Sequence, residues 1–336
     1  MGDDISTGGA VGAAASVTHL GILVVYFLKD DEDIPLLTLH LDRIERHTKV
    51  PYTIYAVANR VTARARSIIG ARPNVRICDV PTTPLRASRE HGYYLDTLLP
   101  IALADGVSHI CTLDVDSFPI DDRWIDVLLE AAPPSSGLAG ILRAENGDVA
   151  LPHPSCIFAG RDFFDEHMPS FSPDSDYTPE FRRFIRSTGQ AADTGIRVGA
   201  TLWNRRLAWG HLTRSNIRNP HYLIAGIYGG VVFHLGGASR RVAFRRDFEH
   251  ARTYRVTRAI EQIPTGHGLI RSIQLQLTRW MRGEVEDLVV DYNRQMFAAL
   301  SSYLVANPDD FLDYLRGAPI PPEHRPMGEA VEGLRS

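Results

Sequence analysis

The chain has 336 residues, of which 44% are hydrophobic and 23% charged, and its formal net charge at pH 7 is −4. A chain of this length and composition can bury a large core, so we expect one large α/β domain with an appendage, or two domains. The slightly acidic balance gives no reason to expect a nucleic-acid partner. No apolar stretch has the length that a transmembrane segment needs.

The chain ends and the cysteines indicate a cytoplasmic protein. The first 18 residues are rich in Gly, Ala and Ser, and Asp3 and Asp4 stand where a signal peptide would be basic, so we expect a disordered leader. The cysteines are odd in number and lie in apolar contexts, which predicts buried thiols in a reducing compartment. A Pro-rich tail is expected from Pro319 onward.

The first 130 residues alternate between strand and helix patterns. We expect strands at 20–27, 52–58, 75–80 and directly before Asp114, and helices from the end of the polar loop 29–33 to His47 and at 88–104. The run at 20–27 is continuously apolar, as in a central parallel strand. Alternation at this spacing predicts an open, mostly parallel sheet with helices on both faces.

The second half continues the alternation and then becomes helical. We expect helices at 121–131, at 179–187 and after Asp193, and strands at 138–143, 156–159, 222–227 and 231–235. Residues 248–317 show an amphipathic helical pattern, in which Leu269, Ile273, Leu277 and Trp280 recur at helical spacing. This stripe predicts core packing or the contact face of a homodimer.

An aspartate pair, Asp114 and Asp116, ends the apolar strand that begins after Gly106. Carboxylates at i and i+2 of a strand end point to one side, and together they suit Mg²⁺ or Mn²⁺, which proteins bind with one or two carboxylates plus substrate phosphates. Such a site can hold a nucleoside diphosphate and neutralise it as a leaving group. The alternative is that the aspartates only cap the following turn. Ligands of open parallel sheets lie beyond the carboxyl ends of the strands, so Phe27 and Asn59 should converge on the same place.

His234 closes an apolar strand and precedes Gly236 and Gly237, where the backbone can approach a ligand closely. Its imidazole can complete a metal site with Asp116 or bind a phosphate. The alternative is a purely structural histidine. Arg240 and Arg241, which follow, favour the first interpretation.

These features together resemble the GT-A class of nucleotide-sugar-dependent glycosyltransferases, with Asp114-Val115-Asp116 as the DxD motif and His234-Leu235-Gly236 as a late H-x-G. The resemblance covers roughly residues 20–240 and is closest to family-2-like bacterial enzymes, whose helix before the metal motif carries a Ser/His-Gly pattern, here at 88–92. It implies a GT-A catalytic domain at 19–245, with a nucleotide-binding half at 19–130 and an acceptor half at 131–245. A helical extension at 246–318 and the tail at 319–336 would follow.

The resemblance also implies roles for individual residues. Asp116 would bind the Mn²⁺ or Mg²⁺ ion, Asp114 would contact the ribose or the ion through water, and His234 would be the third protein ligand. The UDP- or GDP-sugar donor would further be bound by residues at the ends of the first two strands, at the start of the 88–104 helix and between the aspartates: Phe27, Asp30, Asn59, Ser88, Arg89, His91 and Val115. A surface salt bridge with Glu90 or a neighbouring residue is the alternative role for Arg89.

Asp193 is the candidate catalytic base. Inverting enzymes of this fold place a carboxylate near the start of an acceptor-side helix, where it deprotonates the attacking hydroxyl. The alternative is a helix N-cap. This chain lacks the adjacent Glu-Asp pair usual in family 2, and in retaining relatives Asp193 would bind sugar hydroxyls instead. His153, Trp203, Trp209 and His211 are candidates for the lining of an acceptor pocket, and the alternative is that they are core or rim residues.

The expected function is therefore metal-dependent transfer of a hexosyl group from a nucleoside-diphosphate sugar to a hydroxyl acceptor. One alternative is a sugar-phosphate nucleotidyltransferase. That class usually has a Gly-rich, basic loop after the first strand, whereas the loop here contains Asp30, Asp31, Glu32 and Asp33. Another alternative is a non-catalytic protein of the same fold that binds a sugar nucleotide or a glycan, against which the intact Asp114, Asp116 and His234 argue.

Overall fold

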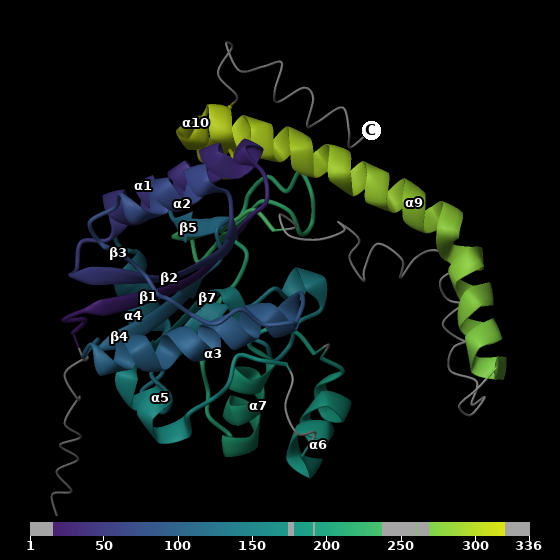
Figure 1. Ribbon diagram of the computed structural model, residues 1–336, viewed down its shortest axis with the longest axis horizontal. Helices are drawn as coiled ribbons and strands as arrows, with labels where there is room; N and C mark the ends of the chain where they lie inside the picture. Colours follow the sequence, from purple (N-terminus) through teal and green to yellow (C-terminus); the bar gives the residue numbers. More distant parts are fainter. Residues whose placement is uncertain (1–15, 174–177, 191, 237–259, 261–268, 320–336) are drawn as a thin grey trace, which may run out of the picture.

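The computed structural model describes residues 16–173, 178–190, 192–236, 260 and 269–319. Most of the expected leader, the tail from residue 320, Gly237, Arg240 and Arg241 lie outside the described residues, as does most of 237–268. The described part is an α/β sandwich with two C-terminal helices (Figure 1).

A seven-stranded sheet forms the centre of the sandwich, in the order β3-β2-β1-β4-β7-β6-β8. Its strands are β1 (Leu20–Leu28), β2 (Tyr52–Val61), β3 (Val75–Ile77), β4 (His109–Leu113), β6 (Leu138–Ile141), β7 (His153–Gly160) and β8 (Gly210–Leu212). Among these seven strands, β7 alone runs antiparallel to its neighbours. The predicted mostly parallel sheet is confirmed.

Helices cover both faces of this sheet, as predicted. One face packs on α1 (Ile34–His47), α2 (Ala63–Gly70) and α4 (Trp124–Ala131), and the other on α3 (Ser88–Ala104), α5 (Arg161–His167) and α7 (Ile196–Arg205). The side chains of β1 explain this arrangement: Ile22 and Val24 belong to the first core, and Leu23 and Val25 belong to the second. Successive residues of a strand point to opposite faces, so a continuously apolar strand needs a helical layer on each side. A further helix, α6 (Pro179–Thr188), packs against α7.

A small antiparallel sheet joins the sandwich to the C-terminal helices. It contains β5 (Ser117–Pro119), β10 (Val232–His234) and β9 (Gly226–Tyr228), in that order. Phe233 of β10 shares a core with Tyr303 of α9 (Leu269–Ala306) and Phe311 of α10 (Pro308–Leu315). Arg43 of α1 forms an ion pair with Asp309 of α10 at 2.7 Å. The predicted helical extension is confirmed for the described residues.

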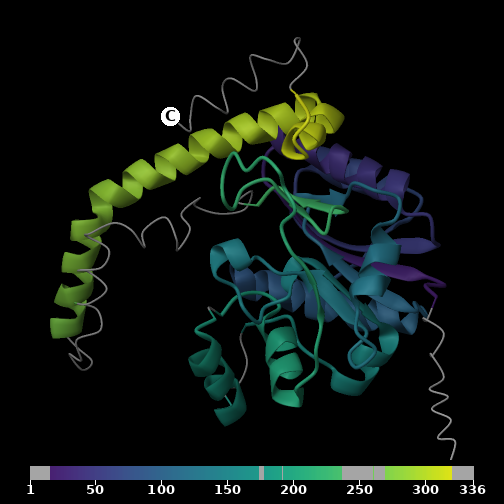
Figure 2. The ribbon, with the colours of Figure 1, turned by 180° about the vertical axis from the view of Figure 1, so that it is seen from behind.

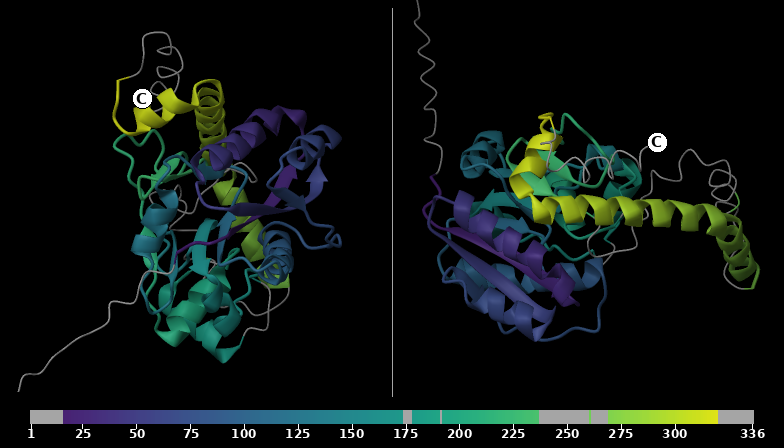
Figure 3. Two further views of the ribbon diagram at one scale, coloured as in Figure 1. Left: turned by 90° about the vertical axis from the view of Figure 1, so that its left-hand side faces the viewer. Right: turned by 90° about the horizontal axis from the view of Figure 1, so that it is seen from above.

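The apolar stripe of α9 does not belong to the core. Ile273, Leu277 and Trp280 are 55%, 45% and 80% exposed, because the N-terminal half of the helix projects beyond the sandwich (Figures 2 and 3). The prediction of core packing is wrong for these three residues. Met296 and Leu300, which are buried, lie in the C-terminal half of α9, where it crosses the small sheet, whereas Gln274 is buried in the N-terminal half. The homodimer face stays a prediction. Within the described residues, no helix has both the length and the apolar character of a membrane span.

Candidate functional site

The aspartate pair occupies the turn between β4 and β5. β4 ends at Leu113, and Ser117 then fixes the turn: the N–H of Asp114 donates to Ser117 Oγ at 3.0 Å, and the N–H of Ser117 donates to the carbonyl of Asp114 at 2.9 Å. Within this turn Asp116 is buried, whereas the side chain of Asp114 is 22% exposed and Val115 is half-buried. The turn therefore holds one carboxylate inside the protein and one at its surface.

The small sheet brings His234 to this turn. His234 is the register partner of Ser117, and the N–H of Leu235 donates to the carbonyl of Asp116 at 2.8 Å. As a result, His234 Nε2 lies 3.7 Å from Asp116 Oδ1, with both side chains buried. Gly236, two residues after His234, has a φ of 72°, a conformation that glycine adopts without strain.

A bulge in β7 adds a second imidazole. The pairing between β6 and β7 is irregular after Gly140: Gly140 faces Ile157, but Ile141 faces His153. Bulges redirect side chains, and here the ring of His153 lies 5.2 Å from the ring of His234. His153 was expected in the acceptor pocket, and the structure places it beside the aspartate turn instead.

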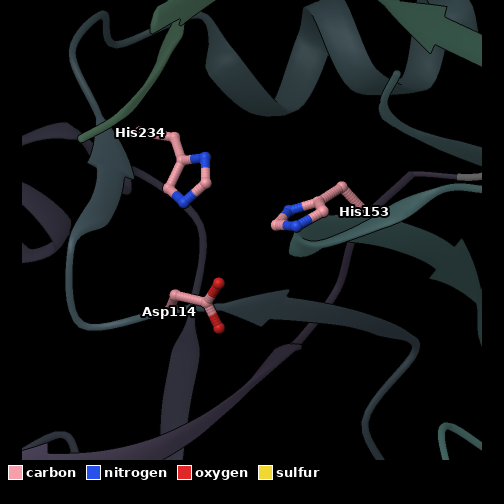
Figure 4. Close-up of side chains that lie close together, drawn as sticks. All are labelled: Asp114, His153 and His234. Atoms are coloured by element: carbon pink, nitrogen blue, oxygen red, sulfur yellow. The ribbon is translucent and has the colours of Figure 1, made fainter. Parts of the chain in front are cut away.

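Asp114, His153 and His234 form one cluster. Each offers one metal-binding atom, and these atoms lie within 4.8 Å of one another. Figure 4 shows the three side chains pointing toward a common space. His153 and His234 are buried, and His91 Nε2 of α3 lies 3.4 Å from Asp114 Oδ1. Two imidazoles and a carboxylate are a donor set that fits a divalent cation.

The surroundings keep His234 neutral. Burial, together with the smaller effect of the positive charges of Arg143 and Arg214, lowers the pKa of His234 to about 3. A neutral imidazole is the form that binds metals. The guanidinium group of Arg214 is itself held by carbonyls before β9, with 2.8 Å to His221 O and 3.0 Å to Ile224 O. Arg143 pairs with Asp148 at 3.3 Å, so both cations near His234 have partners within the protein.

The candidate donor residues lie at the carboxyl ends of β1 and β2 and at the start of α3. Phe27 is half-buried, with its ring 6.4 Å from that of Tyr94. Asn59 Nδ2 donates to the carbonyl of Val80 at 3.0 Å, so part of its role is to hold the following loop. Asp30 and Arg89 are exposed, and their roles stay predictions.

Ser88 links α3 to Asp193. The hydroxyl of Thr194 donates to the carbonyl of Ser88 at 3.0 Å, while Asp193 Oδ1 accepts the N–H of Thr194 at 2.8 Å. Gly195, with φ of 83°, is the N-cap of α7, so the alternative that Asp193 caps this helix is wrong. Asp193 is half-buried beside the first turn of α3, the helix that also carries His91.

The other residues expected near an acceptor lie on α7 and near β8. The ring of Trp203 lies 5.8 Å from that of Phe184, and the ring of Trp209 lies 4.1 Å from that of His211. The rings of Trp203 and Trp209 thus pack against neighbouring rings, and neither these residues nor His211 belongs to the cluster of Asp114, His153 and His234.

No protein-family model matches the chain, and no curated protein sequence matches it. The structure is similar to the galactosyltransferase LgtC, solved with donor and acceptor sugar analogues (12% identity, 58% of this chain and 73% of that chain, TM-score 0.34). It is also similar to the mannosyltransferase PcManGT from Pyrobaculum calidifontis with GDP-Man and Mn²⁺ (13%, 96% and 86%, 0.41). A third similar structure is a mutant Drosophila β-1,4-galactosyltransferase 7 with manganese, UDP-Gal and xylobiose (17%, 53% and 65%, 0.28).

These structural neighbours are GT-A glycosyltransferases, the class that the sequence motifs resemble, and the family-2 subtype stays a prediction. The likeness is distant. The function of this chain is therefore inferred from its own residues.

Proposed function

We propose that the protein is a divalent-metal-dependent glycosyltransferase that moves a hexosyl group from a UDP- or GDP-sugar to a hydroxyl acceptor. The observation that carries this proposal is the contact between Asp116 of the β4–β5 turn and His234 of β10, 3.7 Å apart and both buried. Burying a carboxylate is costly unless it is paired. A bound cation would stabilise this arrangement.

The residues at the turn have complementary roles in this proposal. Asp116 and His234 would hold the ion from inside the protein, and Asp114 would complete its coordination from the open side or contact the ribose. Mn²⁺ or Mg²⁺ bound there would neutralise the diphosphate as the glycosidic bond breaks. His91, 3.4 Å from Asp114, would donate a hydrogen bond to an oxygen of the bound sugar nucleotide.

Donor binding would extend along the carboxyl ends of β1 and β2. Phe27 and Asn59 would flank the nucleotide base, with Asp30 and Val115 completing this part of the site. The first turn of α3, with Ser88 and Arg89, would lie beside the diphosphate or the sugar, since Arg suits phosphate oxygens.

Asp193 is proposed as the general base that takes the proton of the acceptor hydroxyl, which makes the reaction inverting. Support comes from its attachment: Thr194 bonds to Ser88 at the start of α3, and Gly195 N–H donates to Phe171 O at 2.7 Å. These bonds hold the residues next to Asp193 against the helix that carries His91.

The proposal is tested with purified protein freed of metal by a chelator. Incubation with UDP- and GDP-sugars should release the nucleoside diphosphate and free sugar slowly without an acceptor, and only after Mn²⁺ or Mg²⁺ is restored. Asp116→Asn should abolish the release. Formation of a sugar nucleotide from a nucleoside triphosphate and a sugar phosphate would favour the nucleotidyltransferase instead. Tight binding of sugar nucleotides with no cleavage under any condition would favour the non-catalytic binder.

A further inference from the structure

The Asp114 cluster contains one imidazole more than the proposed metal site requires. His153 was not among the expected ligands, yet it converges with Asp114 and His234 on one space (Figure 4). We propose that His153 is a metal ligand, and that the resulting pair of imidazoles makes the site selective for a transition metal such as Mn²⁺ or Co²⁺ over Mg²⁺. This inference rests on the proposed function only in taking Asp114 and His234 as ligands.

Hydrogen bonds from two side chains stabilise the bulge that turns the side chain of His153 inward. Thr112 Oγ1 donates to the carbonyl of Pro154 at 2.6 Å and accepts the N–H of Ile157 at 3.0 Å. Ser117 Oγ donates to the carbonyl of Ser155 at 2.6 Å. Buried backbone groups that a bulge removes from the strand ladder need such partners. The two side chains that provide them flank the aspartate turn, so the bulge and the turn form one unit.

The orientation of the His153 ring also fits a ligand. Its Nδ1 lies 2.7 Å from Ser155 Oγ and 3.3 Å from the backbone nitrogen of Ser155, whose N–H it accepts when it is unprotonated. The tautomer in which Nδ1 instead donates to Ser155 Oγ has its lone pair on Nε2, so a metal bound through Nε2 would select that tautomer. Metal-binding histidines are usually oriented in this way by a partner on the other ring nitrogen. Ser155 is therefore a positioning residue for His153.

Selectivity follows from the chemistry of the ligands. Mg²⁺ prefers oxygen ligands in near-ideal octahedral geometry and is usually bound by one or two carboxylates and water. Imidazole nitrogen suits Mn²⁺ less than it suits Co²⁺ or Zn²⁺, but it suits all three better than Mg²⁺. The buried imidazoles of His153 and His234 would occupy two coordination positions at which Mg²⁺ prefers oxygen ligands.

The test is direct metal binding to the chelator-treated protein without nucleotide. Free Mn²⁺ is measured by electron paramagnetic resonance, and Mg²⁺ and Co²⁺ are added as competitors. We expect Mn²⁺ and Co²⁺ to bind at least about tenfold more tightly than Mg²⁺, and His153→Ala to weaken Mn²⁺ binding by about tenfold or more. His153→Asp, which replaces nitrogen by oxygen, should shift the preference toward Mg²⁺.

His109→Asn is the matched control. His109 is also a buried histidine of this sheet, but it lies at the start of β4 and stacks on Phe158, with ring centroids 5.2 Å apart. Its replacement removes a buried imidazole without touching the cluster, so Mn²⁺ affinity should stay unchanged. Pulsed electron paramagnetic resonance of the wild-type Mn²⁺ complex should detect two coordinated imidazole nitrogens, a readout that does not depend on any variant folding.

Equal affinities for Mn²⁺ and Mg²⁺, or a single coordinated imidazole nitrogen in the wild type, would overturn the inference. Metal-dependent cleavage of a sugar nucleotide that is indifferent to His153→Ala would also overturn it while the proposed function stands. Conversely, Mn²⁺ bound through two imidazoles by a protein that neither binds nor cleaves any sugar nucleotide would support the inference and contradict the proposed function.

Discussion

The hydroxyl of Thr112, on β4, donates a hydrogen bond to the carbonyl of Pro154, in the bulge of β7, at 2.6 Å. The same oxygen accepts the N–H of Ile157, so one buried side chain satisfies two backbone groups that the strand ladder leaves unpaired. Thr112 lies two residues before Asp114 in the sequence. The geometry of the aspartate turn and that of His153 are therefore coupled through a residue that touches no ligand.

Replacing Thr112 by valine tests this coupling. Thr112→Val keeps the shape of the side chain but leaves a buried carbonyl and a buried N–H unpaired, so the free energy of unfolding should fall by about 1–3 kcal/mol. Mn²⁺ affinity should fall as well, because the bulge that orients His153 is no longer fixed. Thr112→Ser, which keeps the hydroxyl, should restore the metal affinity. Urea denaturation and Mn²⁺ titration measure the two effects. Unchanged Mn²⁺ affinity in Thr112→Val would show that the bulge does not depend on this residue.

A second prediction concerns the close approach of α3 to the loop before α6. A Cβ on Gly92 would lie 2.5 Å from Ser172 Cα and 2.8 Å from the carbonyl oxygen of Phe171, both backbone atoms. Gly92→Ala should therefore force the helix and the loop apart and lower the free energy of unfolding by about 1–3 kcal/mol. Gly70→Ala at the end of α2 is the control, since its nearest contact would be the side chain of Ile77 at 3.5 Å.

The Gly70→Ala control should be neutral, or stabilising by up to about 1 kcal/mol. Gly92→Ala would displace the carbonyl of Phe171, which accepts a hydrogen bond from the N–H of Gly195. Because this bond holds the segment next to Asp193, the variant should also slow catalysis. Equal stability of the two alanine variants in urea denaturation would argue against the close packing of Gly92.

A third prediction is the pH dependence of stability that arises from His40. This residue is fully buried, its Nδ1 lies 2.9 Å from the carbonyl of Ser117, and burial lowers its pKa from 6.5 to about 4. Between these pH values the unfolded chain binds a proton that the folded protein does not, so stability falls as the pH falls from about 6.5 toward 4. Above pH 6.5 both states are neutral at this residue and the effect disappears.

His40→Asn isolates this contribution, because asparagine keeps an N–H donor for Ser117 O and cannot titrate. Urea denaturation at pH 7.5, 6.5 and 5.5 should give a shallower fall in stability for the variant than for the wild type. The difference in slope should approach, at most, about 1.4 kcal/mol per pH unit. His234 is present in both proteins, so its own contribution cancels in the comparison. Identical slopes would mean that His40 is protonated equally in both states.

A fourth prediction concerns Asp193. If it is the general base, Asp193→Asn should lower kcat by about 10²–10⁴-fold, while the affinities for Mn²⁺ and for the nucleotide should change little. Asp126→Asn, an exposed aspartate on α4, is the control and should leave kcat unchanged. The anomeric configuration of the product, followed by nuclear magnetic resonance, should be inverted. Full turnover by Asp193→Asn, or retention of configuration, would contradict the assignment.

The elements that the sequence predicts well are those whose hydrophobic pattern is long enough to identify the element without knowledge of its partners. The apolar run of β1 needs a core on both faces wherever it lies, and the 88–104 helix contains enough turns for its pattern to be unambiguous. Short elements such as β5 and β8 contain three residues each and are stabilised by partners distant in sequence, so no local pattern identifies them. The exposed stripe of α9 shows the reverse problem, since helical periodicity does not reveal whether a partner surface exists.

The same reasoning explains which parts of the site the sequence could indicate. Asp114 and Asp116 follow a recognisable buried strand, and His234 closes another, and the resemblance to the GT-A class implies that these residues share a metal site. His153 is different. The position of its side chain depends on a bulge that is hydrogen-bonded to Thr112 and Ser117, which lie about forty residues earlier in the chain. The local sequence around a histidine at the start of a strand does not predict such a bulge. The alternative that Asp193 caps the helix is wrong, because Gly195 in its left-handed conformation is the N-cap and the helix begins at Ile196.

The central claim is that the β4–β5 turn and His234 hold a cation that faces a nucleoside diphosphate. Isothermal titration of UDP and of GDP into the protein, with and without Mn²⁺, tests it most directly. We expect at least one of the two nucleotides to bind in the presence of Mn²⁺, to bind far more weakly without it, and to lose the metal-dependent part of its affinity in Asp116→Asn. Binding that is equally tight without metal and in Asp116→Asn, or no binding of either nucleotide with Mn²⁺ present, would contradict the claim.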